Sequence, residues 1–372
     1  MLCMILVSCT GQKTGKENDN NDKIAIEVGE IKFPPQDVLQ LKSYYLSSSV
    51  HVDSIDYLIG YNYRLHSLDC MNLKSKSVTQ IVLPGDGPDA IVRLSGIYAQ
   101  SLDSVWISDE SERAFLIDSV RTIKRMIDLK KYLEDQEQLL INTNYAMFTS
   151  HLFYNASRHS LMFLVKHTPS NTFIVKEVFI DEVGKMATYQ LSSSKVVPDM
   201  SKGYAYINFP NVNFVGENIV YNYPVESSIY MLDIRTNERK YILADSHYTS
   251  NIIEKCTTSG DYATLEKHWL ENSHFYDIMY LPKYKIYARL HADKVDFDEK
   301  KGMEKLINER DLYLMLFDEN MEKIGETKLS NCRYSPFTSW NATYGGIALF
   351  VDNVLDEKNN TDDLTIDIIS LK

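Results

Sequence analysis

Hydrophobic and polar positions alternate along most of the chain in short runs that are typical of β-strands. From residue 23 onward one pattern occurs five times: an apolar strand ends in Asp, a polar turn follows, and a second strand ends in Leu. The five aspartates are Asp69, Asp118, Asp181, Asp233 and Asp318, and the leucines follow them by 14, 11, 10, 10 and 11 positions. An Asp after a strand can accept hydrogen bonds from the next backbone amides in an Asx-turn. The pattern predicts five repeated β-hairpins and structural, non-catalytic aspartates.

The spacing of the hairpins predicts the architecture. Successive aspartates lie 49, 63, 52 and 85 residues apart, and each interval has room for about two further strands before the next hairpin. Four strands per repeat make one blade of a β-propeller. The longest interval, between Asp233 and Asp318, carries two insertions, which we interpret as a short helix over 265–271 and an acidic loop over 293–310.

The two ends of the chain supply the remaining blade in this interpretation. Residues 346–353 and 364–371 are predicted strands joined by a polar loop, and the chain ends where a fourth strand should begin. Residues 24–31 form a strand without a hairpin partner, and pairing it with the last blade removes the exposed edges of an open array. We predict an all-β, six-bladed β-propeller that the N-terminal strand closes. Seven blades are the alternative, with the extra blade in the interval 233–318.

The first residues differ from the rest of the chain. Residues 6–9, Leu-Val-Ser-Cys, resemble a bacterial lipobox, in which the cysteine is lipidated and becomes the first residue after cleavage. Only eight residues precede Cys9 and none is Lys or Arg, whereas a secretory signal carries a basic region, so either the true start lies upstream of Met1 or the segment is not processed. Residues 10–22 contain no apolar side chain, as expected for a solvated tether. A buried N-terminal strand is the alternative interpretation of the apolar segment.

These features predict three regions and a location. We expect a lipoprotein signal segment at 1–8, a flexible tether at 9–22 that carries the lipidated Cys9, and a β-propeller domain at 23–372. Thr10 rather than Asp follows the cysteine, and by resemblance to sorted lipoproteins this indicates the outer membrane, with the domain facing the periplasm or the outside. The membrane, reached through the lipid anchor, is therefore an expected partner.

Composition excludes several classes of protein. The 372 residues are 44% hydrophobic and 24% charged with a mean hydropathy of -0.27, enough for a large globular core. The apolar start is far shorter than the roughly 18 residues of a membrane-spanning helix. A formal charge of -12, without a Lys/Arg cluster, makes nucleic acid an unfavourable partner. Beyond Cys3 and Cys9, we predict that Cys70, Cys256 and Cys332 are small buried residues with at most one disulfide.

Several segments resemble known propellers. The matching segments are Pro84 to Ala90, Asp103 to Asp109, the Asp118 hairpin, Phe275 to Tyr280, Tyr287 to Arg289 and Gly345 to Ala348. The first three resemble the repeat of six-bladed propellers of the NHL-like and TolB-like superfamilies. The others extend the likeness to a family of Gram-negative propeller lipoproteins of uncharacterised function. The resemblance covers most of residues 23–372 and implies a fold but no activity.

No local motif predicts catalysis or a metal site. The sequence lacks a Gly-x-Ser-x-Gly elbow, a sialidase Asp box and a His-Glu-x-x-His pair. Acidic runs at 293–299 and 356–363 lack the glycine-punctuated spacing of a calcium loop, so we interpret them as solvated loops. We therefore assign no catalytic residue, metal ligand or cofactor, and leave the ligand-binding residues open.

Two functions from different classes remain. The first is a membrane-anchored binding or scaffold module for a protein or a glycan, which recognises its ligand through the propeller face. The alternative is a channel-mouth hydrolase or lactonase, whose ligands would come from separate blades and leave no local motif. Arg289, His274 and Trp340 are candidates for such a face, although packing or solvent exposure is the favoured role for each. We expect binding without turnover.

Overall fold

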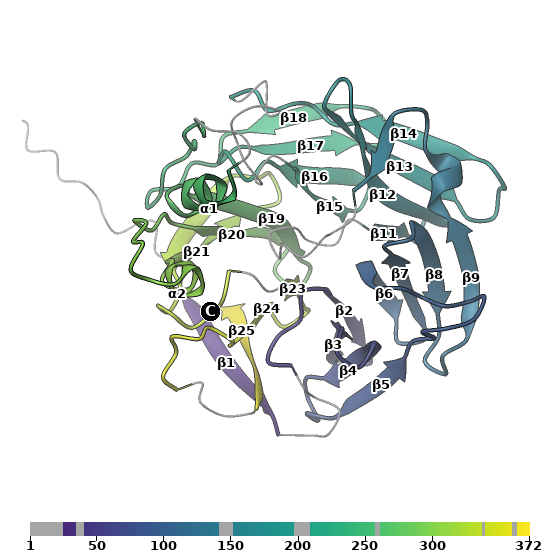
Figure 1. Cartoon of the computed structure of the whole chain (residues 1–372), viewed down its shortest axis with the longest axis horizontal. Coiled ribbons are helices and arrows are strands. Elements are labelled where there is room, and N and C mark those ends of the chain that lie inside the picture. Colours follow the sequence, from purple (N-terminus) through teal and green to yellow (C-terminus); the bar gives the residue numbers. More distant parts are fainter. Residues whose placement is uncertain are drawn as a thin grey trace, which may run out of the picture.

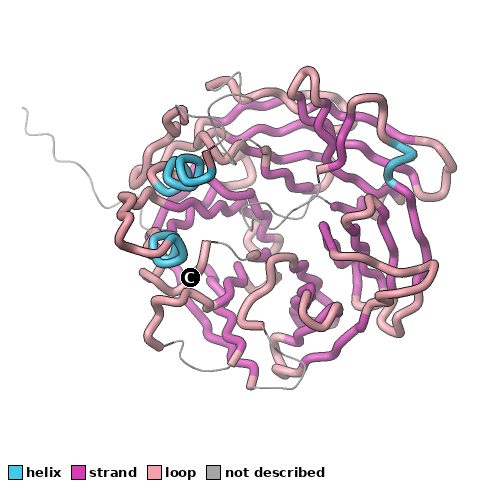
Figure 2. The backbone as a smooth tube through the Cα atoms, in the orientation of Figure 1, coloured by secondary structure: helices cyan, strands magenta, loops and turns pink. Residues whose placement is uncertain are grey.

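The protein is a six-bladed β-propeller. The computed structural model describes residues 25–34, 41–140, 152–196, 209–256, 261–336, 339–358 and 363–372. These residues form six antiparallel sheets around a central axis (Figure 1). Strands dominate the ring, and the helices lie at its periphery (Figure 2). The predicted all-β, six-bladed fold is confirmed.

The first three blades follow one another along the chain, each from its innermost to its outermost strand. Blade 1 contains β2 (Ser47–Val52), β3 (Ile55–Asn62), β4 (Ser67–Asn72) and β5 (Val78–Val82). Blade 2 contains β6 (Leu94–Ser101), β7 (Ser104–Asp109), β8 (Arg113–Ile117) and β9 (Ile123–Asp128), before the 3-10 helix η1 (Leu129–Tyr132). Blade 3 contains β11 (Leu152–Asn155), β12 (Ser160–His167), β13 (Thr172–Phe179) and β14 (Met186–Gln190), and β10 (Glu137–Leu139) also pairs with β12.

The other three blades complete the ring. Blade 4 contains β15 (Asn211–Val215), β16 (Asn218–Asn222), β17 (Ile229–Asp233) and β18 (Arg239–Ile242). Blade 5 contains β19 (His274–Leu281), β20 (Ile286–Ala292), β21 (Leu312–Phe317) and β22 (Lys323–Lys328). Blade 6 contains β23 (Trp340–Ala342), β24 (Ile347–Phe350), β25 (Leu364–Leu371) and β1 (Ile26–Phe33).

Two helices interrupt the strands in the longest interval. Helix α1 (Tyr262–Leu270) confirms the predicted helix, whereas α2 (Met303–Asn308) lies within the segment predicted as an acidic loop. The loop prediction is wrong there because Leu306 and Ile307 are buried in the core that blades 3 and 4 share with α1. No seventh sheet occurs between Asp233 and Asp318 in the part of this interval that is described. Neither these helices nor η1 is long and apolar enough to cross a membrane.

The five predicted hairpins are confirmed as the third and fourth strands of blades 1 to 5. Three of the five aspartates form the predicted Asx-turns. Asp118 Oδ1 accepts hydrogen bonds from the amides of Val120 (3.1 Å) and Thr122 (2.7 Å). In blade 5, Asp318 accepts from the amides two and four residues on, as Asp118 does, and in blade 4 Asp233 accepts from those two and three residues on. The local turn chemistry therefore recurs around the ring.

The Asx-turn prediction is wrong for Asp69. This side chain is fully buried in β4, where its carboxylate accepts hydrogen bonds from Tyr44, Asn62, Ser67 and Gln80. The turn after β4 is formed by Asn72, whose Oδ1 accepts from the amides two and three residues later. Asn72 precedes Leu83 by 11 positions, and the corresponding distance in the other blades is 10 or 11, so the longer spacing of 14 marks the misassigned residue.

Asp181 also departs from the predicted turn. Its carboxylate is exposed and forms an ion pair with Arg125 of blade 2 at 3.4 Å, and no Asx-turn hydrogen bond to it occurs among the described residues. Asp181 therefore contributes to the contact between blades 2 and 3 rather than to its own turn.

The N-terminal strand closes the ring as predicted. Strand β1 pairs antiparallel with β25, from Ile26 opposite Leu371 to Phe33 opposite Leu364. In Figure 1 the purple β1 and the yellow β25 lie next to each other, although they come from opposite ends of the chain. Phe33 is fully buried in a core cluster with Leu58 of blade 1, so β1 joins the last blade to the first.

Candidate functional site

The six innermost strands surround a cavity of about 490 Å³ on the propeller axis. Residues of β2, β6, β11, β15, β19 and β23 line it, so every blade contributes to the wall. Pockets that hold small ligands typically measure about 300 to 1,000 Å³. We therefore treat this central cavity as the candidate site.

One side of the wall is aromatic. Tyr98 of β6, Phe153 of β11 and Phe214 of β15 come from three neighbouring blades. The ring centroids of Tyr98 and Phe153 lie 6.4 Å apart, and those of Phe153 and Phe214 lie 6.2 Å apart. These distances are those of interacting aromatic pairs. The three rings form a continuous apolar surface, which we call the aromatic arc.

The rest of the wall, from blades 4 and 5 through blade 6 to blade 1, carries most of the polar side chains that line the cavity, beside apolar ones such as Leu46 and Met279. Asn341 Nδ2 of β23 donates to Ser47 Oγ of β2 at 2.6 Å. Ser49 Oγ donates to the Ala342 carbonyl oxygen, and Asn213 Nδ2 donates to that of Ile278 at 2.8 Å. These bonds cross from one blade to the next and hold the polar side chains in place. We call this part of the wall the polar arc.

A β-bulge places one carboxyl group in the polar arc. The pairing of β19 with β20 shifts register between Phe275 and Ile278, which leaves Tyr276 and Asp277 in the bulge. Bulges redirect side chains, and they are common next to functional sites. Blade 4 supports the bulge in β19, because Asn211 Nδ2 of β15 donates a hydrogen bond of 3.0 Å to the Phe275 carbonyl oxygen. Asp277 thereby lines the cavity.

Asp277 is nearly inaccessible, with 5% of its surface exposed. One carboxyl oxygen accepts a hydrogen bond of 2.9 Å from the indole N–H of Trp340, which also lines the cavity. Burial raises the pKa of Asp277 to about 7, and the bond from Trp340 opposes the shift. The carboxyl group therefore changes its charge near neutral pH.

The other carboxylate in the wall, Asp56, is already fully engaged. It accepts hydrogen bonds from the amides of Tyr344 and Gly345 at 3.1 and 2.9 Å, and its distance to His51 Nδ1 is 2.8 Å. The His51 ring stacks on Tyr344 with 4.3 Å between centroids. These contacts connect the first hairpin of blade 1 to that of blade 6. The described wall contains no Lys or Arg, and its acidic side chains are Asp56 and Asp277.

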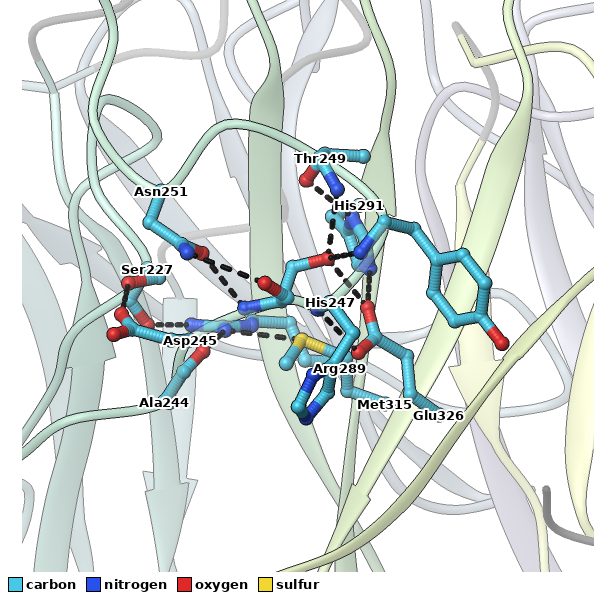
Figure 3. A network of polar contacts seen from close by, with 12 residues as sticks. Ser227, Ala244, Asp245, His247, Thr249, Asn251, Arg289, His291, Met315 and Glu326 are labelled. Atoms are coloured by element: carbon cyan, nitrogen blue, oxygen red, sulfur yellow. Dashed lines mark hydrogen bonds and ion pairs between the residues drawn. The ribbon is translucent and has the colours of Figure 1, made fainter. Parts of the chain in front are cut away.

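A second polar network lies between blades 4 and 5, outside the cavity (Figure 3). The fully buried guanidinium of Arg289 donates to the carbonyl oxygens of Ser227 (2.5 Å) and Ala244 (2.9 Å). It also packs against the rings of Phe275 and Phe317. Burial lowers the pKa of Arg289 to about 9. Arg289 is therefore a structural link between blades and does not belong to an exposed face.

Glu326 and His291 form the other half of this network. Glu326 Oε1 lies 2.8 Å from His291 Nε2, and its carboxylate accepts further bonds from Ser246 Oγ and the His247 amide. Burial alone would raise the pKa of Glu326, but the bonds from His291, His247 and Ser246 lower it to about 2. Both side chains have no exposed surface, so they stabilise the blade interface and are closed to substrates.

The sequence matches a family model described as Domain of unknown function (DUF4221) over residues 17–328. The chain belongs to this family. A crystal structure of a DUF4221 member from Bacteroides vulgatus has a TM-score of 0.76 at 14% identity, with 95% of this chain and 99% of that chain covered. A Bacteroides fragilis protein described as exported has a TM-score of 0.57 at 13% identity, with 93% and 95% covered. At these identities the structures show a shared fold, and no curated protein matches the sequence.

Within this DUF4221 fold, the three residues considered for a binding face have different places. Trp340 lines the cavity, Arg289 is buried between blades, and His274 is buried with its ring 4.5 Å from that of Tyr276. Sequence reasoning missed Asp277. The available signal was a charged residue inside the otherwise apolar run of β19.

The three cysteines of the propeller differ in burial. Cys70 is buried as predicted, whereas the burial predicted for Cys256 and Cys332 is wrong, because both are partly exposed. None of the three forms a disulfide. Cys9, the predicted lipidation site, lies outside the described residues, as do the signal segment and the tether. Across the described ranges, no group of three or more His, Cys, Asp or Glu side chains is arranged to hold a metal ion.

Proposed function

We propose that this protein is a binding module of the cell envelope that takes a ring-sized, non-anionic ligand, such as the end of a glycan, into its central cavity. One observation carries the proposal: an aromatic arc and a polar arc face the same 490 Å³ cavity. The aromatic arc suits the apolar face of a ring, and the polar arc suits hydroxyl groups. The absence of Lys and Arg from the described wall disfavours anionic ligands.

The wall favours binding over hydrolysis. Glycoside hydrolysis ordinarily uses two carboxyl groups that flank the scissile bond. Of the two carboxylates in the described wall, Asp56 is engaged by backbone amides and His51, which leaves Asp277 alone. A channel-mouth hydrolase or lactonase is therefore the second candidate, and the experiment below includes it as an outcome.

An envelope location is supported by two observations. The lipobox resemblance at residues 6–9 predicts an anchor, and a protein of the same fold from Bacteroides fragilis is described as exported. Ile26, the first residue of β1, pairs with Leu371 near the end of β25. The turn between β23 and β24 lies at the same end of blade 6, so the chain enters the propeller on this side. We propose that a lipid on Cys9 anchors the propeller to the outer membrane from this side of the ring.

Titration of the purified protein with a panel of neutral mono- and disaccharides tests the binding proposal, with Trp340 in the wall as a fluorescent reporter. We expect saturable binding that Phe214→Ala weakens by about tenfold, or about 1.4 kcal/mol. Tyr262→Ala is the matched control, because this ring is 52% exposed on α1 and away from the cavity. Melting curves check that both variants fold.

Two outcomes would contradict the proposal. If no saccharide in the panel binds, the cavity is not a glycan site. If the wild-type protein hydrolyses a chromogenic glycoside or a lactone, and Asp277→Asn abolishes the hydrolysis, the enzyme is the correct alternative.

A further inference from the structure

The carboxyl group of Asp277 is held at the cavity wall, where a ligand can reach it. Trp340 donates a hydrogen bond to Oδ1, and the backbone amide of Asp277 itself also bonds to the carboxyl group. The β19 bulge and its support from β15 fix the group at this point. Because Asp277 lines the cavity, a ligand that enters can bind this carboxyl group in place of water.

The surroundings of Asp277 define the charge of that partner. No Lys or Arg of the described wall is present to neutralise the carboxylate. Trp340 and Tyr280 line the same cavity, and aromatic faces attract cations. A hydroxyl group could donate a hydrogen bond to the carboxylate but would leave its negative charge unpaired. A protonated amine donates a hydrogen bond and also neutralises the charge.

We infer that the central cavity selects a ligand whose ring-sized body carries a protonated amine, and that Asp277 binds this amine. The inference rests on the proposed function and names the chemical class of its ligand. The aromatic arc would hold the body of the ligand, while the carboxylate of Asp277 accepts a hydrogen bond from the ammonium group. Two sources share this chemistry, an amino sugar and an arylalkyl amine, and the experiment separates them.

The amine competes with a proton for the same carboxyl group. Because the pKa of Asp277 is about 7, the group is mostly protonated at pH 5.5 and about half ionised at pH 7. The preference for amines should therefore weaken as the pH falls. Other titratable side chains that line the cavity are Tyr45, His51, Asp56, Tyr98, Tyr280 and Tyr344. An Asp277→Asn variant separates their contribution from that of Asp277.

The test compares free and acetylated amines of equal ring size by calorimetry with the full chain. The probes are glucosamine, N-acetylglucosamine, tyramine and N-acetyltyramine at pH 7.0 and 5.5. We expect at least one free amine to bind the wild-type protein at least about tenfold more tightly than its acetylated form at pH 7.0. Which amine shows the preference identifies the source. The preference should fall at pH 5.5 and should disappear in Asp277→Asn.

Asp86→Asn is the matched control, because this aspartate is exposed in the loop between blades 1 and 2. It should retain the full preference. If acetylated and free amines bind the wild-type protein equally, the inference is wrong while the proposed function stands. If neither sugar binds, and tyramine and N-acetyltyramine bind equally or not at all, both the inference and the proposed function are wrong. Should Asp277→Asn fail to fold, the pH comparison on the wild-type protein decides, because a preference unchanged between pH 7.0 and 5.5 overturns the role of Asp277.

Discussion

Replacing Phe33 by Ala tests how the propeller closes. Phe33 is the last residue of β1, and none of its surface is exposed. It belongs to a core cluster that contains Leu58 and Met71 of blade 1 together with Phe350 and Ile366 of blade 6. Phe33→Ala therefore removes a large side chain at the seam where the two ends of the chain meet.

The expected cost follows from the burial of this side chain. Truncation of a fully buried Phe typically lowers the free energy of unfolding by about 3 to 5 kcal/mol, because the lost transfer free energy adds to the cost of a cavity. In a domain of this size such a loss lowers the melting temperature by roughly 5 °C or more. Urea titration followed by tryptophan fluorescence measures the free energy, and a thermal melt checks it.

Val28→Ala is the matched control within the same strand. Val28 lies on β1, but 45% of its surface is exposed, so we expect its truncation to change the stability by about 0.5 kcal/mol or less. If Phe33→Ala unfolds with the same midpoint as the wild-type protein, or if the two variants lose equal stability, β1 does not close the ring through this core.

Two further predictions concern the buried network and the anchor. The pKa of Glu326 lies near 2 in the folded state and near 4.5 when unfolded, so its contribution to stability is complete above pH 4.5 and is lost as the pH falls toward 2. Glu326→Gln should flatten the pH dependence of the melting temperature between pH 6 and 3. Glu319→Gln is the control, because Glu319 is exposed, and it should leave this dependence unchanged. Parallel curves for the wild-type protein and Glu326→Gln would contradict this role. For the anchor, the wild-type protein should partition with membranes and the Cys9→Ala variant should remain in the soluble fraction. The reason is that the acyl chains of a lipidated cysteine anchor a protein stably. Equal partitioning of the two forms would refute lipidation.

The sequence alone specified the blades because their determinants are local. Side chains alternate between the two faces of a strand, and a turn residue such as Asp118 binds the amides two and four positions after it, so both signals act within one hairpin. Closure was also predictable, because an unpaired strand at residues 24–31 and an incomplete last blade each need an edge partner. Where the local signal was ambiguous, as at Asp69 and Asn72, tertiary contacts determined which residue forms the turn.

The candidate site was decided by the tertiary structure. Tyr98, Phe153, Phe214 and Trp340 come from four different blades, and only ring closure brings strands so distant in sequence around one cavity. The segment containing Asp277 was recognised as part of a propeller motif, but its pattern gives no sign of a bulge or of the Asn side chains that support it from blade 4. Periodicity reports which residues pack within a strand, whereas the orientation and the pKa of Asp277 depend on groups that other blades supply.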